Sequence, residues 1–206
     1  MSVLYPNDIL YNATVFHVIF GQLIKHDLSM SPQPQDITGR NMQCTCNDTN
    51  NPFCMVVQTP SNDKINQDES CFAIPRTTSS KKNWNCQSNF REQINKLTSW
   101  LDLSQLYGSD DNKMNNLRSN VDSGFLNTQI LPGFDKHVFM SGQSGPNQCL
   151  RDTPKMPCFN SGEERTNENT ALTAVQVLLL RQHNLIARQL KNLTGWTGET
   201  LFQRTR

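Results

Sequence analysis

The stretch FHVIFGQLIKHD, residues 16–27, decides the first element of the fold and contains the first candidate site residues. Its apolar residues recur at helical spacing and cover most of the circumference, which predicts a buried helix over residues 7–28. Gln22 and His26 are four positions apart and therefore share one face of that helix. Local sequence leaves two roles open for His26, because a histidine in an apolar helix is more often a hydrogen-bonded core residue than a base.

A second motif, LTSWLDLS at residues 97–104, places oxygen-bearing residues at alternate positions. In an extended loop, alternate side chains fall on the same side. Together with the aspartate that follows His26, they form a hard oxygen set of the kind that Ca²⁺ prefers. The candidate ligands are Asp27, Thr98, Trp100 through its carbonyl, Asp102 and Ser104. An ordinary polar turn with Asp102 as a helix cap, and a surface position for Asp27 near its helix end, are the alternatives.

A third segment, ERTNE at residues 164–168, places a guanidinium among carboxylates. A fixed Arg165 could stabilise negative charge that develops on a substrate oxygen. An exposed Arg165 paired with a neighbouring glutamate is the alternative. The possible partners are Glu163, Glu164 and Glu168.

The remaining pattern predicts a mainly α chain that forms one partial domain over residues 1–206, with a long polar stretch at residues 31–85. The strongest predicted helix covers residues 169–192, and Gly195 fits its end. Its core face is predicted to contain Leu172, Val175, Leu178, Leu179, Ile186 and Leu190. Further helices are predicted over residues 90–98, 103–107, 110–118 and from 197 onward, with short strands near 124–126 and 133–139.

Composition excludes two classes of partner. The net charge is only +1 and the basic residues are scattered, so no nucleic-acid footprint is indicated. No uncharged apolar stretch reaches 18 residues, so no membrane span is predicted.

Seven cysteines, four of them between residues 44 and 71, favour disulfides in an oxidising compartment. Zinc is the competing interpretation, but the single-residue gap between Cys44 and Cys46 is too short for a usual zinc knuckle. The odd count suggests that Cys86 pairs outside this chain. Three Asn-X-Thr sequons add to the expectation of a secreted glycoprotein, and their asparagines are Asn12, Asn47 and Asn192.

In combination, these motifs resemble those of the animal haem peroxidases. GQLIKHDL at residues 21–28 is similar to the family's distal helix motif, and residues 91–109 are similar to its calcium loop. LLLRQHN at residues 178–184 resembles a family helix, and Cys149 and Cys158 resemble a disulfide pair of the family. The resemblance implies a partial animal haem peroxidase domain with long disulfide-pinned loops.

The resemblance also implies roles. His26 would be the distal base, Arg165 would polarise the O–O bond of H₂O₂, and Gln22 would hold water or halide. Glu168 matches a carboxylate that can form an ester with haem b, whereas Lys25 falls where the family has its other haem-linking carboxylate. At most one ester is therefore expected. The Ca²⁺ ligands implied are Asp27, Thr98, Trp100 through its carbonyl, Asp102 and Ser104.

The family's proximal iron ligand, a histidine well downstream of the distal arginine, has no good counterpart in this chain. We therefore expect an internal piece that supplies the distal half of the site and is inactive alone, while the remainder of the domain supplies the proximal histidine. The intact protein would be a secreted enzyme that reduces H₂O₂ and oxidises halide, phenolic or other aromatic donors. The alternatives are a non-catalytic, calcium-binding adhesion or scaffold relative and a small calcium-binding disulfide domain.

Overall fold

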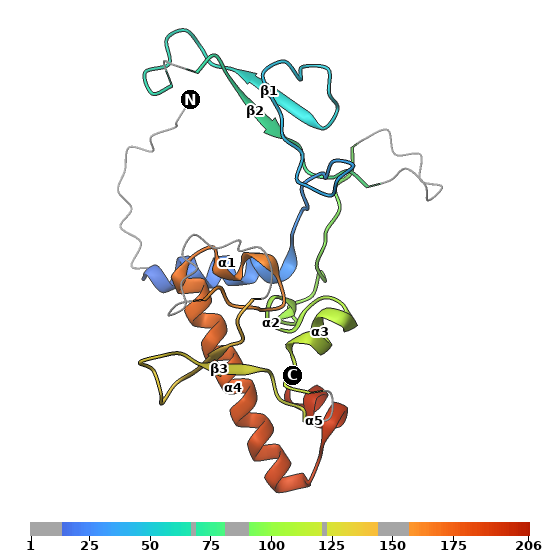
Figure 1. Cartoon of the computed structure of the whole chain (residues 1–206), viewed down its shortest axis with the longest axis vertical. Helices are drawn as coiled ribbons and strands as arrows, with labels where there is room; N and C mark the ends of the chain where they lie inside the picture. The colour runs from blue at the N-terminus through green and yellow to red at the C-terminus, as the bar shows by residue number, and fades with distance from the viewer. Residues whose placement is uncertain (1–13, 67–68, 81–90, 121–122, 144–156) are drawn as a thin grey trace. The chain divides into compact units, whose positions relative to one another are not determined.

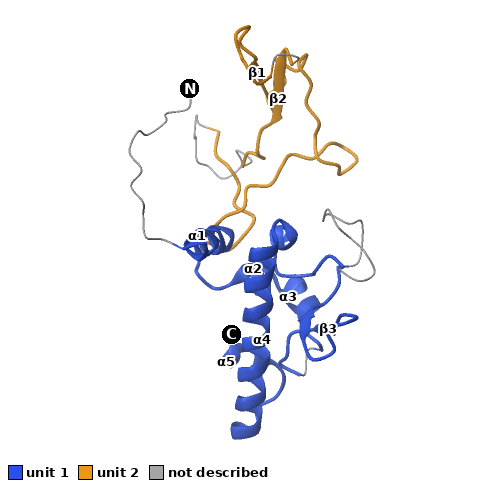
Figure 2. Cartoon of the chain, turned by 90° about the vertical axis from the view of Figure 1, so that its left-hand side faces the viewer, with its two compact units in different colours: residues 1–28, 100–206 blue, residues 29–99 orange. Residues whose placement is uncertain are grey.

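The computed structural model describes residues 14–66, 69–80, 91–120, 123–143 and 157–206 (Figure 1). The chain divides into two compact units, each with many contacts within itself (Figure 2). Unit 1 combines residues 1–28 with residues 100–206, and unit 2 comprises residues 29–99. That residues 1–206 form one partial domain stays a prediction.

All helices of the described residues belong to unit 1. They are α1 (Val15–Leu28), α2 (Ser104–Tyr107), α3 (Asp111–Leu117), a 3₁₀ turn η1 (Glu164–Asn167), α4 (Thr170–Thr194) and α5 (Gly198–Thr205). Two short antiparallel strands, β3 (Thr128–Ile130) and β4 (Val138–Met140), pair beside them. The predicted helices at 103–107, 110–118, 169–192 and from 197 onward are confirmed. The strand near 124–126 is only an isolated bridge at Leu126, and the strand predicted over 133–139 starts later, at Val138.

The long helix α4 begins and ends where its sequence predicts. The Asn169 side chain accepts a hydrogen bond from the Leu172 amide at 2.8 Å, and Gly195 ends the helix with a φ of 70°. The predicted core face is wrong in detail, because only Leu172 of the six named residues is buried and Leu178 is exposed. The buried face is instead rotated toward Gln176 and His183, two polar residues that find hydrogen-bond partners inside the unit.

The core of unit 1 lies where α4 meets α2, α5 and the β3–β4 pair. Its buried members include Leu106, Tyr107, Leu117, Leu126, Leu131, Met140, Val177, Leu180 and Phe202. His183 is buried beside this core: its Nδ1 is 3.0 Å from the Tyr107 hydroxyl and its Nε2 is 3.1 Å from the Gly124 carbonyl oxygen. Burial raises the pKa of Tyr107 to about 12, so its hydroxyl stays protonated and donates to His183 Nδ1. His183 Nε2 then carries the proton that it donates to Gly124.

This buried histidine should make stability depend on pH. Burial, reinforced by the Arg118 charge and opposed by the Gly124 hydrogen bond, lowers the pKa of His183 below its usual 6.5. An unfolded histidine binds a proton near pH 6.5, so the unfolded state gains protons first as the pH falls. The free energy of unfolding should therefore decrease as the pH falls below 6.5, toward the folded-state pKa of His183. His183→Gln should remove this contribution and cost about 2 kcal/mol at pH 7.5 through two altered hydrogen bonds.

Urea midpoints of the intact protein between pH 5 and pH 8 measure the effect. His137→Gln, at an exposed histidine, is the matched control. A pH dependence that is the same in the His183 and His137 variants would contradict the assignment.

Helix α1 is less buried than its sequence predicts. Of the predicted 7–28 helix, residues 7–13 lie outside the described chain and Val15–Leu28 are helical. Within unit 1, α1 packs on α2 and α4, and only His26 and Asp27 are buried. Val15 and Val18 remain 77% and 70% exposed, because the contacts of α1 concentrate at its C-terminal end.

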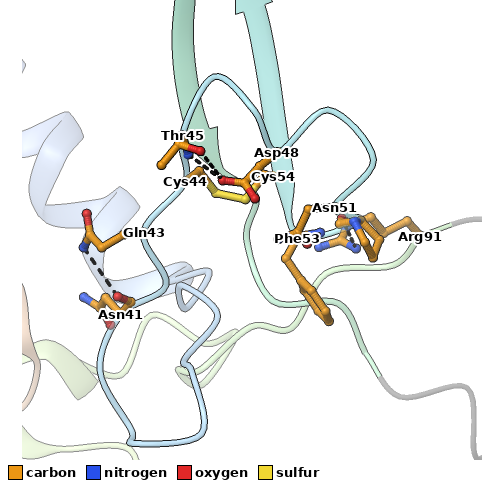
Figure 3. Close-up of a disulfide and its surroundings, with 10 residues drawn as sticks. Asn41, Gln43, Cys44, Thr45, Asp48, Asn51, Phe53, Cys54 and Arg91 are labelled. Atoms are coloured by element: carbon orange, nitrogen blue, oxygen red, sulfur yellow. Dashed lines mark hydrogen bonds between the residues drawn. A yellow bond between two sulfur atoms is a disulfide. The ribbon is translucent and has the colours of Figure 1, made fainter.

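Unit 2 is a loop-rich segment around one antiparallel hairpin, β1 (Cys54–Gln58) and β2 (Cys71–Pro75). Two disulfides, Cys44–Cys54 and Cys46–Cys71, fasten the preceding loop to the first residue of each strand. Figure 3 shows the first of them, beside a turn in which Asp48 accepts hydrogen bonds from the Thr45 amide and hydroxyl. The predicted disulfides are confirmed, and the zinc interpretation fails for these four cysteines. Cys158 is also disulfide-bonded, whereas Cys86 and Cys149 lie outside the described residues.

The helix predicted over residues 90–98 is wrong for its described part, residues 91–98. These residues are not helical because their backbone bonds to other loop segments of unit 2, with an isolated β-bridge between Ser79 and Gln93. The Ser80 amide donates to Glu92, and the Lys96 amide donates to Met30. Asn95 adds a side-chain bond from the Met30 amide at 2.9 Å. Tertiary pairing therefore overrides the local helical pattern.

Candidate active site

The site of unit 1 is centred on His26, near the C-terminal end of α1. His26 Nδ1 lies 2.9 Å from Oε1 of Glu163, although 137 residues separate them in sequence. The His26 side chain is 5% exposed and the Glu163 side chain is fully buried. A buried polar pair of this kind fixes both groups, because neither can exchange its partner for water.

Glu163 also holds Arg165. Its second oxygen, Oε2, accepts hydrogen bonds from Arg165 Nε at 2.7 Å and from the Arg165 amide at 3.1 Å. Nη2 of Arg165 reaches back to the His26 carbonyl oxygen at 3.3 Å. Burial tends to raise the pKa of Glu163, but the bonds from His26 and Arg165 outweigh it and the pKa is lowered. Glu163 is therefore a carboxylate at neutral pH.

On the other side of the imidazole, Oε2 of Glu168 lies 3.3 Å from His26 Nε2. The Glu168 side chain is 55% exposed, so its carboxylate can reach beyond the protein interior. Gln22 Nε2 lies 3.5 Å from the same oxygen, and Asn169 Nδ2 donates to Gln22 Oε1 at 2.8 Å. The structure thus brings together Gln22, His26, Arg165 and Glu168, the four residues that the sequence proposed for the distal site.

Helix α2 keeps α1 and the loop before η1 in place. The buried Gln105 side chain donates to the Leu23 carbonyl oxygen of α1 at 2.7 Å. The backbone carbonyl oxygen of Gln105 accepts a hydrogen bond from the Ser161 hydroxyl at 2.9 Å. Gly162 lies so close to the α2 backbone that any side chain there would collide with it. The segments that carry His26 and Glu163 are therefore both held by α2.

The predicted calcium ligands come together in part. Asp27 is 2% exposed, and its carboxylate accepts from the Leu103 amide at 3.0 Å and the Ser104 hydroxyl at 3.4 Å. Asp102 accepts from the Ser104 amide at 3.0 Å. Leu103 has a left-handed φ of 56°, which turns the chain sharply between the last two ligands.

Thr98 belongs to unit 2, so its place relative to Asp27 is not defined, and the Trp100 side chain is exposed. Within the described ranges, no cluster of three or more histidine, cysteine or acidic side chains forms a metal site. The predicted site also depends on hydroxyl and carbonyl oxygens, which are not part of such a cluster. In the same ranges no lysine or arginine forms an ion pair with the buried Asp27.

Sequence reasoning missed two residues of this site. Glu163 was considered only as an alternative partner of Arg165, and its bond to His26 depends on a long-range contact that local sequence does not reveal. Asn169 was not singled out, although its place immediately before a strong helix is a typical capping signal.

Comparison with known proteins identifies the family. The family model "Animal haem peroxidase" matches residues 3–206. The chain belongs to the animal haem peroxidases. Membership implies haem as the cofactor, and it places the site of His26 and Arg165 in a family of oxidoreductases.

The curated relatives include myeloperoxidase from Mus musculus, 32% identical over 99% of this chain but only 30% of the relative. Lactoperoxidase from Homo sapiens is 30% identical over 95% of this chain and 28% of the relative. The peroxidasin homolog from Mus musculus is 32% identical over 91% of this chain and 14% of the relative. The chain therefore spans less than a third of the length of these relatives.

Solved structures agree on the fold. Peroxidase A from Dictyostelium discoideum aligns with a TM-score of 0.53 at 20% identity, over 91% of this chain and 35% of that one. Fatty acid alpha-dioxygenase from Oryza sativa aligns with a TM-score of 0.59 at 16% identity, over 91% and 25%. These likenesses support a partial peroxidase fold. Helices exceed strands in the described part, but long loops make "mainly α" only a partial description.

Proposed function

We propose that this chain supplies the distal half of a haem peroxidase site in a larger protein that reduces H₂O₂. The observation that supports this most strongly is the convergence of His26 and Arg165 on the buried carboxylate of Glu163. A purely structural role would not require a base (His26), a fixed cation (Arg165) and a carboxamide (Gln22) close to the half-exposed carboxylate of Glu168.

The proposed chemistry follows from these groups. Haem, when bound, would supply the redox-active iron for the reduction of peroxide. His26 takes the proton from one oxygen of H₂O₂ and returns it to the other, which leaves as water. Arg165 stabilises the negative charge that develops as the O–O bond breaks. Gln22 holds water or a halide by hydrogen bonding.

The residues of the site fit the distal side of haem b. Glu168, half exposed beside His26 Nε2, is the carboxylate in a position to form an ester with the cofactor. Lys25 is exposed on α1 and cannot form a second ester, so we propose at most one link. His183, the histidine that follows Arg165, has both ring nitrogens hydrogen-bonded in the core. The remainder of the domain would therefore supply the proximal histidine, and this chain alone would be inactive.

We also propose that Ca²⁺ binds at the carboxylate of Asp27. Its burial without a basic partner in the described residues favours a cation, because the hydrogen bonds from Leu103 and Ser104 do not neutralise its charge and a buried charge without a counter-ion is costly. The Ser104 hydroxyl at 3.4 Å and the nearby Asp102 in the sequence would add hard oxygen donors. The resemblance to the family adds Thr98 and the Trp100 carbonyl as expected ligands. Because Asp27 follows His26 directly in the sequence, an ion bound to Asp27 would hold the end of α1, and with it His26, in position.

Calcium should therefore stabilise the intact protein in a way that depends on Asp27. At a Ca²⁺ concentration 100 times its Kd, binding adds about 2.7 kcal/mol to the free energy of unfolding. Asp27→Asn should abolish the increase in melting temperature on adding Ca²⁺, and a chelator should bring the wild type to the level of the variant. Asp135→Asn, at an exposed aspartate, is the control and should respond to Ca²⁺ like the wild type. An unchanged Ca²⁺ response in Asp27→Asn would reject this site.

Secretion and glycosylation belong to the same proposal. Two disulfides in unit 2 and a bonded Cys158 fit an oxidising compartment. Asn47 of the NDT sequon is exposed, as is Asn192, whereas Asn12 lies outside the described residues. Among the described residues, no helix combines the length and apolar character needed to cross a membrane.

Absorption and turnover of the intact protein test the function. A haem Soret band together with H₂O₂-dependent oxidation of a phenol, an aromatic amine or a halide is expected. The second candidate is a non-catalytic, calcium-binding scaffold of the same fold. Lys25 favours this candidate, because it is an exposed lysine at the position where the family has a haem-linking carboxylate. A calcium response without a Soret band or turnover would support the scaffold and overturn the peroxidase.

A further inference from the structure

We propose that Glu163 is the positioning residue of the site, and that its two carboxylate oxygens set the tautomer of His26 and the direction of Arg165. The inference rests on the proposed peroxidase function and deepens it. One oxygen meets His26 Nδ1 at 2.9 Å, and the other meets Arg165 Nε at 2.7 Å. Glu163 touches no reacting atom in this assignment, so it acts through the two groups that it holds.

The hydrogen-bond chemistry determines which nitrogen of His26 carries a proton. An ionised carboxylate can only accept, so the nitrogen that faces it must be the donor. A neutral imidazole has a single N–H. Both ring nitrogens face a carboxylate, but the Glu163 contact is shorter, 2.9 Å against 3.3 Å to Glu168, and its carboxylate is fully buried, whereas Glu168 is half exposed and would lose its charge as a haem ester. We therefore assign the N–H to Nδ1 and the lone pair to Nε2. Nε2 is the nitrogen on the side of the half-exposed Glu168. The lone pair thus faces the half-exposed side of the ring, where a substrate could approach beside Glu168.

The burial of Glu163 makes this arrangement rigid. Its side chain is fully buried, so no bulk water competes for either oxygen. It also begins the η1 turn, where Oε2 accepts the Arg165 amide as well as Nε. The same carboxylate therefore fixes the backbone and the side chain of Arg165. One carboxylate therefore contacts both the base and the cation, and the bond from Arg165 Nη2 to the His26 carbonyl oxygen adds a second link between them.

The test compares Glu163→Gln, Glu163→Asp and a neighbouring control, Glu164→Gln, in the intact protein. Glu164 is exposed, whereas Glu163 is buried. Glu163→Gln can donate an N–H to Nδ1 and thereby favour the opposite tautomer. We expect its rate with H₂O₂ to fall about 100-fold, as when a carboxylate that orients a catalytic or metal-bound histidine is replaced. The KM for the reducing donor should not change. Glu163→Asp keeps the charge and should recover part of the rate, and Glu164→Gln should match the wild type.

Nitrogen-15 NMR of labelled histidines gives a readout independent of turnover. The His26 signals, assigned by their loss in His26→Gln, should show Nδ1–H in the wild type and Glu163→Asp and a shift toward Nε2–H in Glu163→Gln. Haem-bound samples are measured as the diamagnetic ferrous carbon monoxide complex. A wild-type rate and tautomer in Glu163→Gln overturn the inference. If that variant does not fold, a wild-type rate in Glu163→Asp overturns it and a reduced rate with the Nδ1–H tautomer supports it.

The two levels of proposal fail in different ways. A wild-type protein without a Soret band or peroxide reaction overturns the peroxidase function. The NMR comparison needs no haem, so it still decides whether Glu163 sets the tautomer of His26.

Discussion

His26→Ala should reduce the rate at which the intact, haem-loaded protein reacts with H₂O₂ by about 10²- to 10⁴-fold, which is the usual contribution of a positioned general base. The His26 side chain is 5% exposed and hydrogen-bonded to Glu163, so it cannot be replaced by a neighbouring side chain without rearrangement. Stopped-flow absorption at the Soret band measures the rate directly. Haem binding should survive, because the proximal ligand would come from elsewhere in the domain.

The matched control is His17→Ala. His17 lies on the same helix but is exposed, so its loss should leave the rate within a factor of two of the wild type. Arg165→Ala should cost about 10²- to 10³-fold through loss of a fixed cation. Arg188→Ala, at an exposed arginine of α4, is the control for charge. Peroxide reactivity that survives both His26→Ala and Arg165→Ala would refute the assigned roles.

The sequence predicts local elements well where chemistry is local. Asp110 accepts from the Lys113 amide at 2.9 Å and starts α3, and Asn169 and Gly195 bound α4 within a few residues of the prediction. It fails where partners are distant. The 90–98 segment looks helical by its own pattern but is not helical, because Asn95 bonds to Met30, 65 residues away.

The same distinction applies to the site. Sequence motifs selected Gln22, His26, Arg165 and Glu168 through their resemblance to a family, and the structure brings them together. Glu163 could not be selected in this way, because one glutamate among several near Arg165 gives no sign of which one reaches His26. Burial and distance single it out: its side chain is fully buried and touches both groups, whereas Glu164 is exposed.

Gly162→Ala adds only one methyl group, but it should disrupt the site severely. A β-carbon at Gly162 would collide with the Ser104 carbonyl oxygen and the Gly108 amide nitrogen, and would lie 2.8 Å from the Gln105 carbonyl carbon. All three are backbone atoms of α2 and its end, so no flexible side chain can move aside. The 161–165 segment must shift, and with it the carboxylate of Glu163. We expect a loss of about 3 kcal/mol in the free energy of unfolding, the upper part of the range for overpacking.

Gly142→Ala is the control for this prediction, because a β-carbon there would have no neighbour closer than 3.7 Å. Urea unfolding followed by circular dichroism gives the stability of both variants, and the Soret band reports haem binding. Gly162 precedes Glu163 directly, and α2 also holds Ser104 against Asp27. A displaced 161–165 segment should therefore weaken the Ca²⁺ response and the peroxide reaction together, whereas Glu163→Gln should affect only the reaction. A Gly162→Ala protein as stable and as active as Gly142→Ala would mean that α2 does not position the distal residues.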